Sequence, residues 1–497
     1  MSLVSATFLL FLVASLFCYF ISPRGVRWIV LLAASYVFYW IVGGFFALGA
    51  ISFTIATVYF CSLWASSLRK QREKRTKRRL PLAICLILNF GALLLFKYSG
   101  VILPKIGILL IPGISFYTFQ AAGYLTDVYR GKAEPEKNPL KLALFLSFFP
   151  QLIQGPISRH SEIAADLFAG HGWDWDRSRN GVQRIIWGYF MKLIVADRAA
   201  VIVDKVFSGY ENYGGATIII VLLVYSVQIY ADFAGGINVT LGIGEILGIK
   251  MPENFKQPFF ANSLADFWRR WHITLSSWLK DYLFYPIALS KLMGRLRKLT
   301  RKMFGARIGK LLPACVATFC VYIVMGIWHG SGKSVFVFGF LNGFIISASL
   351  LMAPFIDKLR AKTKLDGGAK GFGHAFAITR TLVILVILRY FARADALRGA
   401  LAMLKWTVLH PQLRELWDGT IFNLGLGATD YIVLALGFIA ILACDYVAER
   451  GKDWRDAING TRPIVQFSVL LVALASITAF GIFSSSALSA TFIYAQY

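Results

Sequence analysis

Residues 325–343, "MGIWHGSGKSVFVFGFLNG", decide between a nucleotide-binding fold and a membrane fold. They place "GSGKS", which is similar to a phosphate-binding loop, directly after His329. A phosphate loop of this type needs a glycine five positions before Gly332, and it lies between a strand and a helix. Ile327 stands at that position, and both flanks are apolar runs. We therefore interpret Gly330 to Gly332 as a tight turn between two membrane helices.

The composition of the whole chain also favours a membrane protein. Of its 497 residues, 57% are hydrophobic and 16% are charged, and the mean hydropathy is +0.62. A membrane span needs roughly 20 mostly apolar residues, so we expect an all-α multi-pass membrane protein with about 11 to 13 membrane-associated helices, some of them re-entrant. We expect a single domain over residues 1–497. The apolar runs cover residues 3–22, 28–45, 47–66, 80–96, 101–125, 141–157, 181–203, 215–234, 311–328, 334–356, 376–392, 428–447 and 464–485.

The basic residues gather in short segments between the apolar runs. Lys and Arg number 52 against 26 Asp and Glu, which gives a formal net charge of +26. Excess Lys and Arg in short loops mark the cytoplasmic side of a membrane protein, and these charges also attract anionic lipids. We therefore place loops 68–79, 291–310 and 357–370 in the cytoplasm, and we expect contact with membrane lipids but no nucleic-acid partner. His329 then lies in the outer half of the membrane.

Three segments differ from ordinary spans. Pro150 and Pro156 interrupt the run 141–157, so we expect it to enter the membrane and turn back without crossing. The polar, Trp-bearing segment 160–180 is expected to be a loop at the membrane interface. Residues 250–290 mix charged, aromatic and apolar side chains, which indicates amphipathic helices at the interface or helices that dip into a protein-lined cavity.

Two histidines are candidate catalytic residues, and each also has a structural interpretation. His329 is either a helix-end histidine satisfied by a neighbour or a functional group, because an ionisable side chain within a span is costly. His272, in "DFWRRWHITLSSW", is either functional or part of an interfacial helix with Trp anchors and snorkelling Arg side chains. The six cysteines form no C-x-x-C pair, so the sequence indicates neither a disulfide framework nor a metal site.

Six blocks of sequence resemble the membrane-bound O-acyltransferase (MBOAT) family, and within it the bacterial branch that O-acetylates cell-envelope polysaccharides. The blocks span most of the chain in the order of that family. They are "ISFYTFQAAGYLTDVYRG" (114–131), "SFFPQLIQGPISRH" (147–160), "MPENFKQPFFANSLADFWRRWHITLSSWLKDYLFYPI" (251–287), "GIWHGSG" (326–332), "RYFARADAL" (389–397) and the tail "FIYAQY" (492–497).

The resemblance implies a ring of tilted helices around a thin centre, with a funnel from each side meeting near the catalytic histidine. By motif, His329 corresponds to the near-invariant catalytic histidine of the family, and His272 to the second histidine of the polysaccharide branch. The segment 231–244 departs from the usual pattern, because Gly236 replaces a Tyr and Asn238 replaces an Asp.

The resemblance also implies a reaction. An acetyl group would move from cytoplasmic acetyl-CoA, a substrate rather than a bound cofactor, towards hydroxyls of an envelope or secreted polysaccharide. An extracytoplasmic acyltransferase partner would receive it at the inner (cytoplasmic) membrane. Histidine suits a general base because its ordinary pKa lies near operating pH, so we expect His329 to take the hydroxyl proton. Lys291, Arg295 and Arg297 are candidates for contacting the donor phosphates, and the alternative for each is a simple positive-inside role.

Acylation of a lipid or a protein, as in other branches of the family, stays open, although the "PENF" and "FWRRWH" blocks resemble the polysaccharide branch more. Three further functions also stay open. A sister branch transfers D-alanine towards teichoic acid from a small acidic carrier protein. A polysaccharide transporter without chemistry would equally combine many spans with histidines in a wet cavity. A structural assembly scaffold is the third alternative, and two membrane histidines disfavour it.

Overall fold

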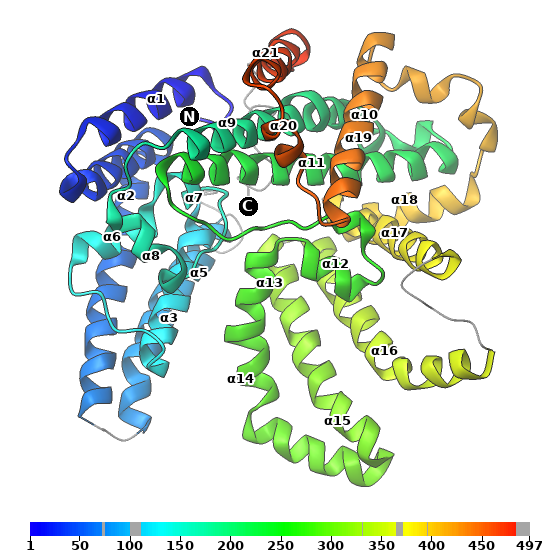
Figure 1. Cartoon of the computed structure of the whole chain (residues 1–497). Helices are drawn as coiled ribbons and strands as arrows, with labels where there is room; N and C mark the ends of the chain where they lie inside the picture. Colours follow the sequence, from blue (N-terminus) through cyan, green and yellow to red (C-terminus); the bar gives the residue numbers. More distant parts are fainter. Residues whose placement is uncertain (72–74, 100–110, 331, 364–370, 395, 484–497) are drawn as a thin grey trace. The chain divides into compact units, whose positions relative to one another are not determined.

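The protein is built from helices in a computed structural model that describes residues 1–71, 75–99, 111–330, 332–363, 371–394 and 396–483 (Figure 1). Eight helical segments in this described part are long and apolar enough to cross a membrane. The predicted all-α multi-pass membrane protein is therefore confirmed. The eight segments are Arg24–Lys70, Thr76–Lys97, Gly215–Leu247, Lys291–His329, Lys333–Ala353, Phe372–Arg393, Ala428–Glu449 and Pro463–Phe480.

Contacts between residues divide the chain into two compact units. The first contains Met1–Ile194, Ala231–Glu253 and Arg455–Tyr497, and the second contains Val195–Tyr230 and Asn254–Trp454. The predicted single domain and the predicted funnels from both membrane faces stay predictions.

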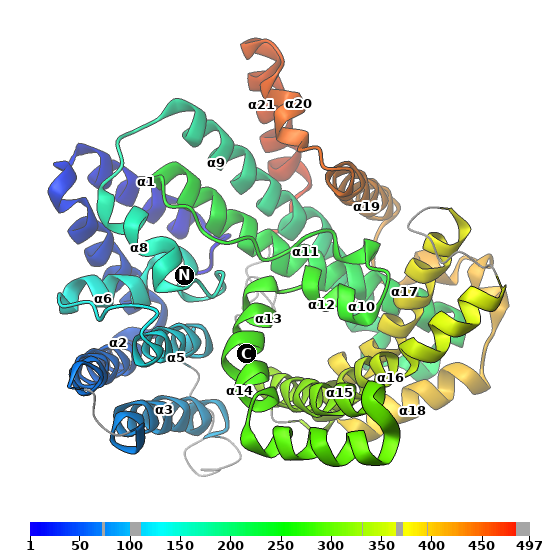
Figure 2. The ribbon, with the colours of Figure 1, turned by 60° about the horizontal axis from the view of Figure 1, so that its bottom comes forward.

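In the first unit, the long helix α2 (Arg27–Lys70) is the centre of a helical group. It merges the predicted runs 28–45 and 47–66, and its backbone leaves the helical conformation at Gly44, where φ is +66°. Helices α3, α5 and α6 lie against α2 (Figure 2). The α-helices of this unit besides α2 are α1 (Ala6–Ile21), α3 (Arg75–Lys97), α5 (Ile114–Arg130), α6 (Pro139–Ser147), α7 (Phe149–Leu152), α8 (His160–Ala169), α9 (Trp175–Tyr189), the second half of α11 (Gly215–Leu247), α20 (Trp454–Asn459) from Arg455 onward, and α21 (Pro463–Phe480).

The predicted interruption of run 141–157 is confirmed. Helix α6 ends at Ser147, and α7 adds only a single turn after the non-helical residue Phe148, whose φ and ψ are −50° and 110°. A continuous helix would place Pro150 in its interior, where proline lacks the N–H that bonds to the preceding turn. Whether the segment turns back within the membrane stays a prediction.

The prediction that 160–180 is a loop is wrong, because α8 forms within it. Ile163 and Leu167 are spaced by four residues and are both buried, which is the pattern of a short helix packed on one face. Gly170, at φ +65°, ends this helix in the left-handed conformation that favours glycine.

Helix α9 and the second half of α11 approach each other at two pairs of glycines. A Cβ at Gly181 would lie 2.5 Å from the carbonyl oxygen of Gly242, and a Cβ at Gly188 would lie 2.5 Å from that of Gly235. The order of the pairs makes this contact antiparallel. Small residues let two backbones come this close, so the two pairs set the distance between the helices.

The two residues that depart from the family pattern lie on the same half of α11. A Cβ at Gly236 would lie 2.9 Å from Nε2 of Gln154, so the side chain of Gln154 lies directly against this glycine. Asn238 accepts a hydrogen bond from Nε of Arg184 at 3.0 Å.

We expect Gly242→Val to destabilise the protein by about 1–3 kcal/mol, because the added side chain overpacks the contact with α9. Gly91→Val is the matched control, since Gly91 lies inside α3 with open space around its Cα. The midpoint of thermal unfolding in detergent measures both variants. Equal shifts for the two variants would show that helix propensity, and not the glycine contact, is responsible.

In the second unit, α15 (Lys291–His329) and α16 (Lys333–Thr363) form a helical hairpin (Figure 1). A Cβ at Gly339 would overlap the Tyr322 carbonyl oxygen, so glycine allows this close contact. The α-helices of this unit besides α15 and α16 are α10 (Asp197–Ser208), the first half of α11, α12 (Leu264–Arg270), α13 (Ile273–Leu279), α14 (Tyr285–Ala288), α17 (Phe372–Arg393), α18 (Leu397–Leu409) and α19 (Ala428–Glu449).

The prediction that 291–310 is a loop is wrong, because α15 begins at Lys291. Ser290 caps this helix by accepting a hydrogen bond from the Met293 backbone N–H, and Leu, Lys and Arg are good helix formers. The backbone breaks only at Gly305, where φ is +80°. The predicted loop 357–370 is helical up to Thr363, and residues 364–370 lie outside the described residues.

Candidate functional site

An antiparallel pairing of two backbone segments positions His272. Phe255 and Trp271 form a β-bridge, and the Lys256 N–H donates to the Arg270 carbonyl at 2.9 Å. The Ile273 N–H donates to the Asn254 carbonyl at 3.0 Å. The "PENF" segment (252–255) therefore lies directly beside "RRWH" (269–272), although more than ten residues separate the two in the sequence.

His272 lies between α12 and α13 in a conformation that is rare for a non-glycine residue. Its φ is +46° and its ψ is +55°, and its side chain is only 1% exposed. A left-handed residue of this kind costs free energy, so it persists only where surrounding contacts hold it. Here the contacts come from the paired segment.

One side-chain oxygen determines which ring nitrogen of His272 carries the proton. Oδ1 of Asn254 accepts from the Thr274 backbone N–H at 3.1 Å and from the Thr274 hydroxyl at 2.8 Å. Since a backbone N–H only donates, this atom is the amide oxygen and not the nitrogen. The same oxygen lies 3.2 Å from Nδ1 of His272. Nδ1 therefore carries the proton, and Nε2 carries the lone pair when the ring is neutral.

Burial keeps the His272 ring neutral. His272 lies outside the eight candidate spans, and its desolvation lowers its pKa well below 6.5, with positive charge on His329 lowering the pKa further. At neutral pH the ring is thus the neutral Nδ1–H form, whose Nε2 is able to accept a hydrogen bond from a hydroxyl.

His329 is the last residue of α15, and it meets His272 across one tryptophan. The Trp328 ring lies 4.8 Å from the His329 ring and 5.9 Å from the His272 ring, centroid to centroid. Phe338 of α16 lies 6.2 Å from the His329 ring on an edge-to-face approach. The structure therefore brings the two predicted histidines to one site in the second unit. Their catalytic roles stay predictions.

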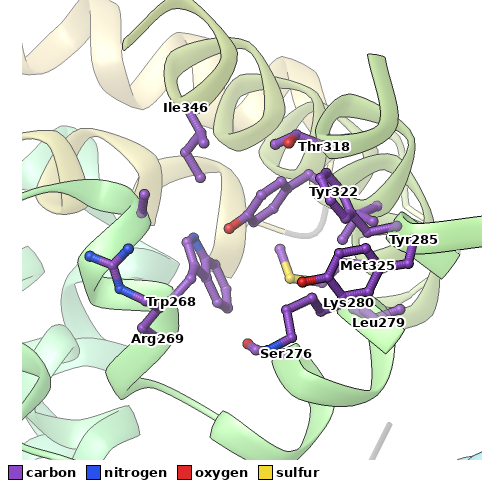
Figure 3. Close-up of a pocket in the computed structure, with 13 residues that line it drawn as sticks. Trp268, Arg269, Ser276, Leu279, Lys280, Tyr285, Thr318, Tyr322, Met325 and Ile346 are labelled. Carbon is purple, nitrogen blue, oxygen red and sulfur yellow. The ribbon is translucent and has the colours of Figure 1, made fainter. Parts of the chain in front are cut away.

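A largely apolar pocket of about 270 Å³, the Trp268 pocket, lies beside this pair (Figure 3). Met325, one turn before His329, lines it, and so does Trp268, one turn before His272. The Trp268 indole N–H donates to Oδ1 of Asn342 at 2.9 Å, which fixes this wall. Two cationic side chains, Arg269 and Lys280, also line the pocket. Neither His272 nor His329 lines the pocket, which adjoins the pair through Trp268 and Met325.

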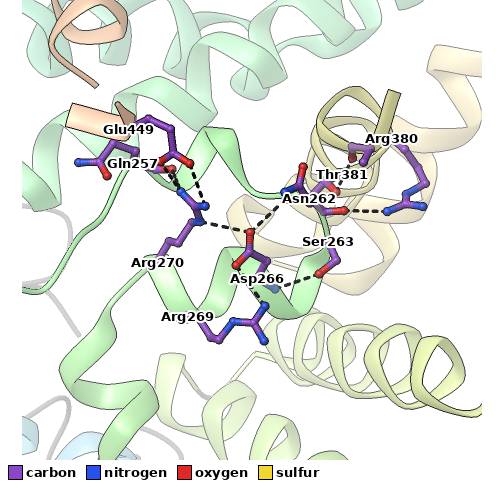
Figure 4. Close-up of polar contacts among 10 residues, drawn as sticks. Gln257, Asn262, Ser263, Asp266, Arg269, Arg270, Arg380, Thr381 and Glu449 are labelled. Atoms are coloured by element: carbon purple, nitrogen blue, oxygen red, sulfur yellow. Dashed lines mark hydrogen bonds and ion pairs between the residues drawn. The ribbon is translucent and has the colours of Figure 1, made fainter. Parts of the chain in front are cut away.

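An ion-pair network anchors α12, the helix that precedes His272 (Figure 4). Arg270 donates to both carboxylate oxygens of Glu449 on α19, at 2.6 and 3.0 Å, and to Asp266 at 3.2 Å. Burial alone raises the pKa of Asp266, but bonds from the Asn262 backbone N–H, Arg270 and Arg269 outweigh burial and hold it below 3.8. The network therefore keeps Arg270 in place two residues before His272.

The structure also tests the remaining sequence predictions near His329. Residues 291–329 are helical and no strand precedes "GSGKS", so the geometry of a phosphate loop is absent from this described segment. The predicted turn has Ser331 at its centre, and Ser331 lies outside the described residues. The candidates Lys291, Arg295 and Arg297 are exposed on α15, and none of them lines the Trp268 pocket. The tail block 492–497 also lies outside the described residues.

Asn254 is the functional candidate that sequence reasoning missed. Its side chain is completely buried. The sequence did contain a signal for this residue, since Asn254 is a polar amide within the quoted "PENF" block. What was missing is its contact with His272, which depends on a pairing across 18 residues.

Comparisons with known proteins agree with these blocks. The MBOAT, membrane-bound O-acyltransferase family, matches residues 136–372. A probable alginate O-acetylase AlgI of Pseudomonas putida is 33% identical over 341 residues, which cover 65% of this chain and 67% of the relative. The protein of the same description from Pseudomonas fluorescens is 34% identical over 330 residues, covering 65% of this chain and 63% of the relative.

The name of a further relative refers to a different polymer, peptidoglycan. A peptidoglycan O-acetyltransferase of Helicobacter pylori is 32% identical over 315 residues, covering 56% of each chain. This chain thus spans between 56% and 67% of the length of these relatives. Together with the helical architecture and the two paired histidines, this similarity shows that the chain belongs to the membrane-bound O-acyltransferase family.

Proposed function

We propose that this protein moves an acetyl group from acetyl-CoA towards hydroxyls of an envelope or secreted polysaccharide. The observation that carries the proposal is the meeting of His329 and a neutral, tautomer-fixed His272 beside the Trp268 pocket. The names of the relatives, alginate O-acetylase and peptidoglycan O-acetyltransferase, support acetyl transfer to a sugar polymer. We place the protein in the cytoplasmic membrane.

His329 acts as the general base in this proposal. It takes the proton of the acceptor hydroxyl while the hydroxyl oxygen attacks the thioester carbonyl. The C–S bond then breaks, the new ester leaves, and the thiolate of the donor takes the proton. General-base catalysis of this kind is typically worth about 10²–10⁴-fold.

His272 orients the acceptor hydroxyl. Its Nδ1–H is engaged by Asn254, so Nε2 offers a lone pair and no proton. A group of this kind accepts a hydrogen bond from a hydroxyl and cannot donate one to the thioester oxygen. Orientation of the attacking group lowers the entropic part of the barrier.

The Trp268 pocket holds the acyl end of the donor. Its volume of about 270 Å³ lies at the small end of ligand pockets, which suits acetyl better than a long acyl chain. Arg269 and Lys280 are cations at this pocket and would contact the phosphates of acetyl-CoA. Lys291, Arg295 and Arg297, the candidates that the sequence offers for this contact, do not line the pocket. The acceptor hydroxyl at His329 belongs to an extracytoplasmic acyltransferase partner, which passes the acetyl group to the polymer.

Ester-linked acetate released from the cell-surface polymer by mild alkali tests this proposal. We expect deletion of the gene to remove the acetate, and the wild-type gene to restore it. D-alanine is measured in the same hydrolysate. Loss of D-alanine ester with unchanged acetate would assign the sister reaction instead. Unchanged levels of both esters on deletion would contradict acyl transfer to the polymer.

A further inference from the structure

A second cavity, in the first unit, is lined by charged side chains. It has a volume of about 400 Å³ and is bounded by α9, the end of α11, the segment that follows α11, and the start of α20. We call it the Arg177 pocket. Its charged lining residues are Arg177, Arg184, Lys250, Arg455, Glu245 and Glu253.

Two of the four cations are matched by the two carboxylates. Arg184 donates to Glu245 at 2.9 Å, to Glu253 at 2.5 Å and to Asn238 at 3.0 Å. Arg455 donates to both oxygens of Glu245, at 3.2 and 3.1 Å. These bonds make a rigid, neutralised wall that connects α9, α11 and α20.

The other two cations carry the excess charge of the pocket. Arg177 is held by a bond from Nη2 to the Gly172 carbonyl at 2.6 Å, and its nearest carboxylate, Asp174, is 3.7 Å away and half exposed. A Cβ at Gly248 would overlap the Arg177 guanidinium, so glycine there allows the guanidinium to lie against the backbone. The ammonium of Lys250 has no ion-pair partner among the described residues, and its side chain is exposed.

The pocket lies where two candidate spans end. α11 ends at Leu247, one residue before Gly248 of the pocket, and the last span begins at Pro463, eight residues after Arg455. The ends of spans lie at the level of lipid head groups, and basic pockets between helices at this level bind anionic head groups. Guanidinium groups in particular match the oxygens of phosphate.

We propose that the Arg177 pocket binds the phosphate of an anionic phospholipid head group. Arg177 and Lys250 contact the phosphate oxygens, and the Arg184–Glu245–Arg455 cluster holds the walls of the cavity in place. Free phosphate has the same chemistry, so the experiment separates these two sources.

The test is thermal unfolding of the purified full chain in detergent, with phosphatidylglycerol, phosphatidylcholine or inorganic phosphate added. We expect phosphatidylglycerol to raise the midpoint of the wild type more than phosphatidylcholine does. Arg177→Gln with Lys250→Gln removes this difference. Lys298→Gln with Lys302→Gln is the matched control, because it removes two exposed cations from the basic first part of α15 and keeps the difference.

Each result either supports or overturns the proposal. A phosphatidylglycerol effect that both double variants retain equally shows diffuse attraction and overturns it, as does the absence of any difference between the lipids. Inorganic phosphate could also stabilise the protein as much as the lipid does, in a way that only the pocket variant loses. That result would show a site for free phosphate and overturn the proposal that the ligand is a lipid head group. None of these outcomes depends on acyl transfer, so the lipid site stands or fails independently of the proposed reaction.

Discussion

Replacing His329 with Gln is expected to lower acyl transfer by about 10²–10⁴-fold, because Gln has nearly the same reach but cannot take a proton. Trp328 and Phe338 lie against the His329 ring, and an amide of similar size keeps these contacts. The fold should therefore survive. Initial rates of acetyl transfer in membranes with matched protein levels measure the effect.

His374→Gln is the control for this variant. His374 lies near the start of α17 and is half-buried like His329. We expect it to leave the rate within about 2-fold of the wild type, as surface substitutions usually do. A His329→Gln rate as high as that of the control would give His329 a purely structural role.

Replacing Asn254 with Leu is expected to lower the rate by roughly 10²-fold or more, since loss of the group that fixes a catalytic imidazole's tautomer is costly. Leu has a similar volume but offers no acceptor to Nδ1 of His272 or to the Thr274 backbone N–H. The effect acts through His272. In a His272→Gln background, Asn254→Leu should therefore cost little more, and pH-resolved initial rates of acetyl transfer measure all four proteins. Equal losses in both backgrounds would show that Asn254 only supports the fold.

Asn254→Asp gives the same prediction a pH signature. A carboxylate still accepts from Nδ1, so activity should be retained near neutral and higher pH. Its negative charge favours protonated His272 and raises the His272 pKa from its depressed value below 6.5. The acid limb of the pH–rate profile should therefore move to higher pH than in the wild type.

The depressed pKa also has a consequence for stability. The unfolded chain binds a proton on this histidine more readily than the folded protein does. The contribution of His272 to stability is thus fully present above pH 6.5 and falls as the pH decreases below that value.

The sequence was sufficient for the type of fold. It also singled out the two histidines that the structure brings to one site, and their catalytic roles stay predictions. Long apolar runs predicted the eight candidate spans, because a span needs roughly 20 mostly apolar residues. The apolar runs 141–157 and 181–203 contain no candidate span, so apolar content alone did not separate spans from other buried helices. Segments 160–180 and 291–310 were wrongly predicted as loops, because charge and Trp content identify a water or interface location and not the absence of a helix. Within the second segment only Gly305 interrupts the helix.

Other features needed the structure because they depend on contacts between distant residues. The motif resemblance singled out His272 and His329, but their common neighbour Trp328 follows from how α15 packs beside the paired segment. The bond of Asn254 to His272 depends on a β-bridge within a region that reads as amphipathic helix. The Arg177 pocket combines α9, α11 and α20, and no local pattern predicts this combination.

The most direct test of the central claim is acetyl transfer by the purified protein in sealed vesicles. Acetyl-CoA with a labelled acetyl group is supplied on the side of the basic segments 68–79 and 291–310. A purified candidate for the proposed extracytoplasmic partner is supplied on the other side. We predict labelled ester on the partner with the wild-type protein, and a rate about 10²–10⁴-fold lower with His329→Gln. Equal labelling by both proteins, or labelling only from an acylated carrier protein, would contradict the account.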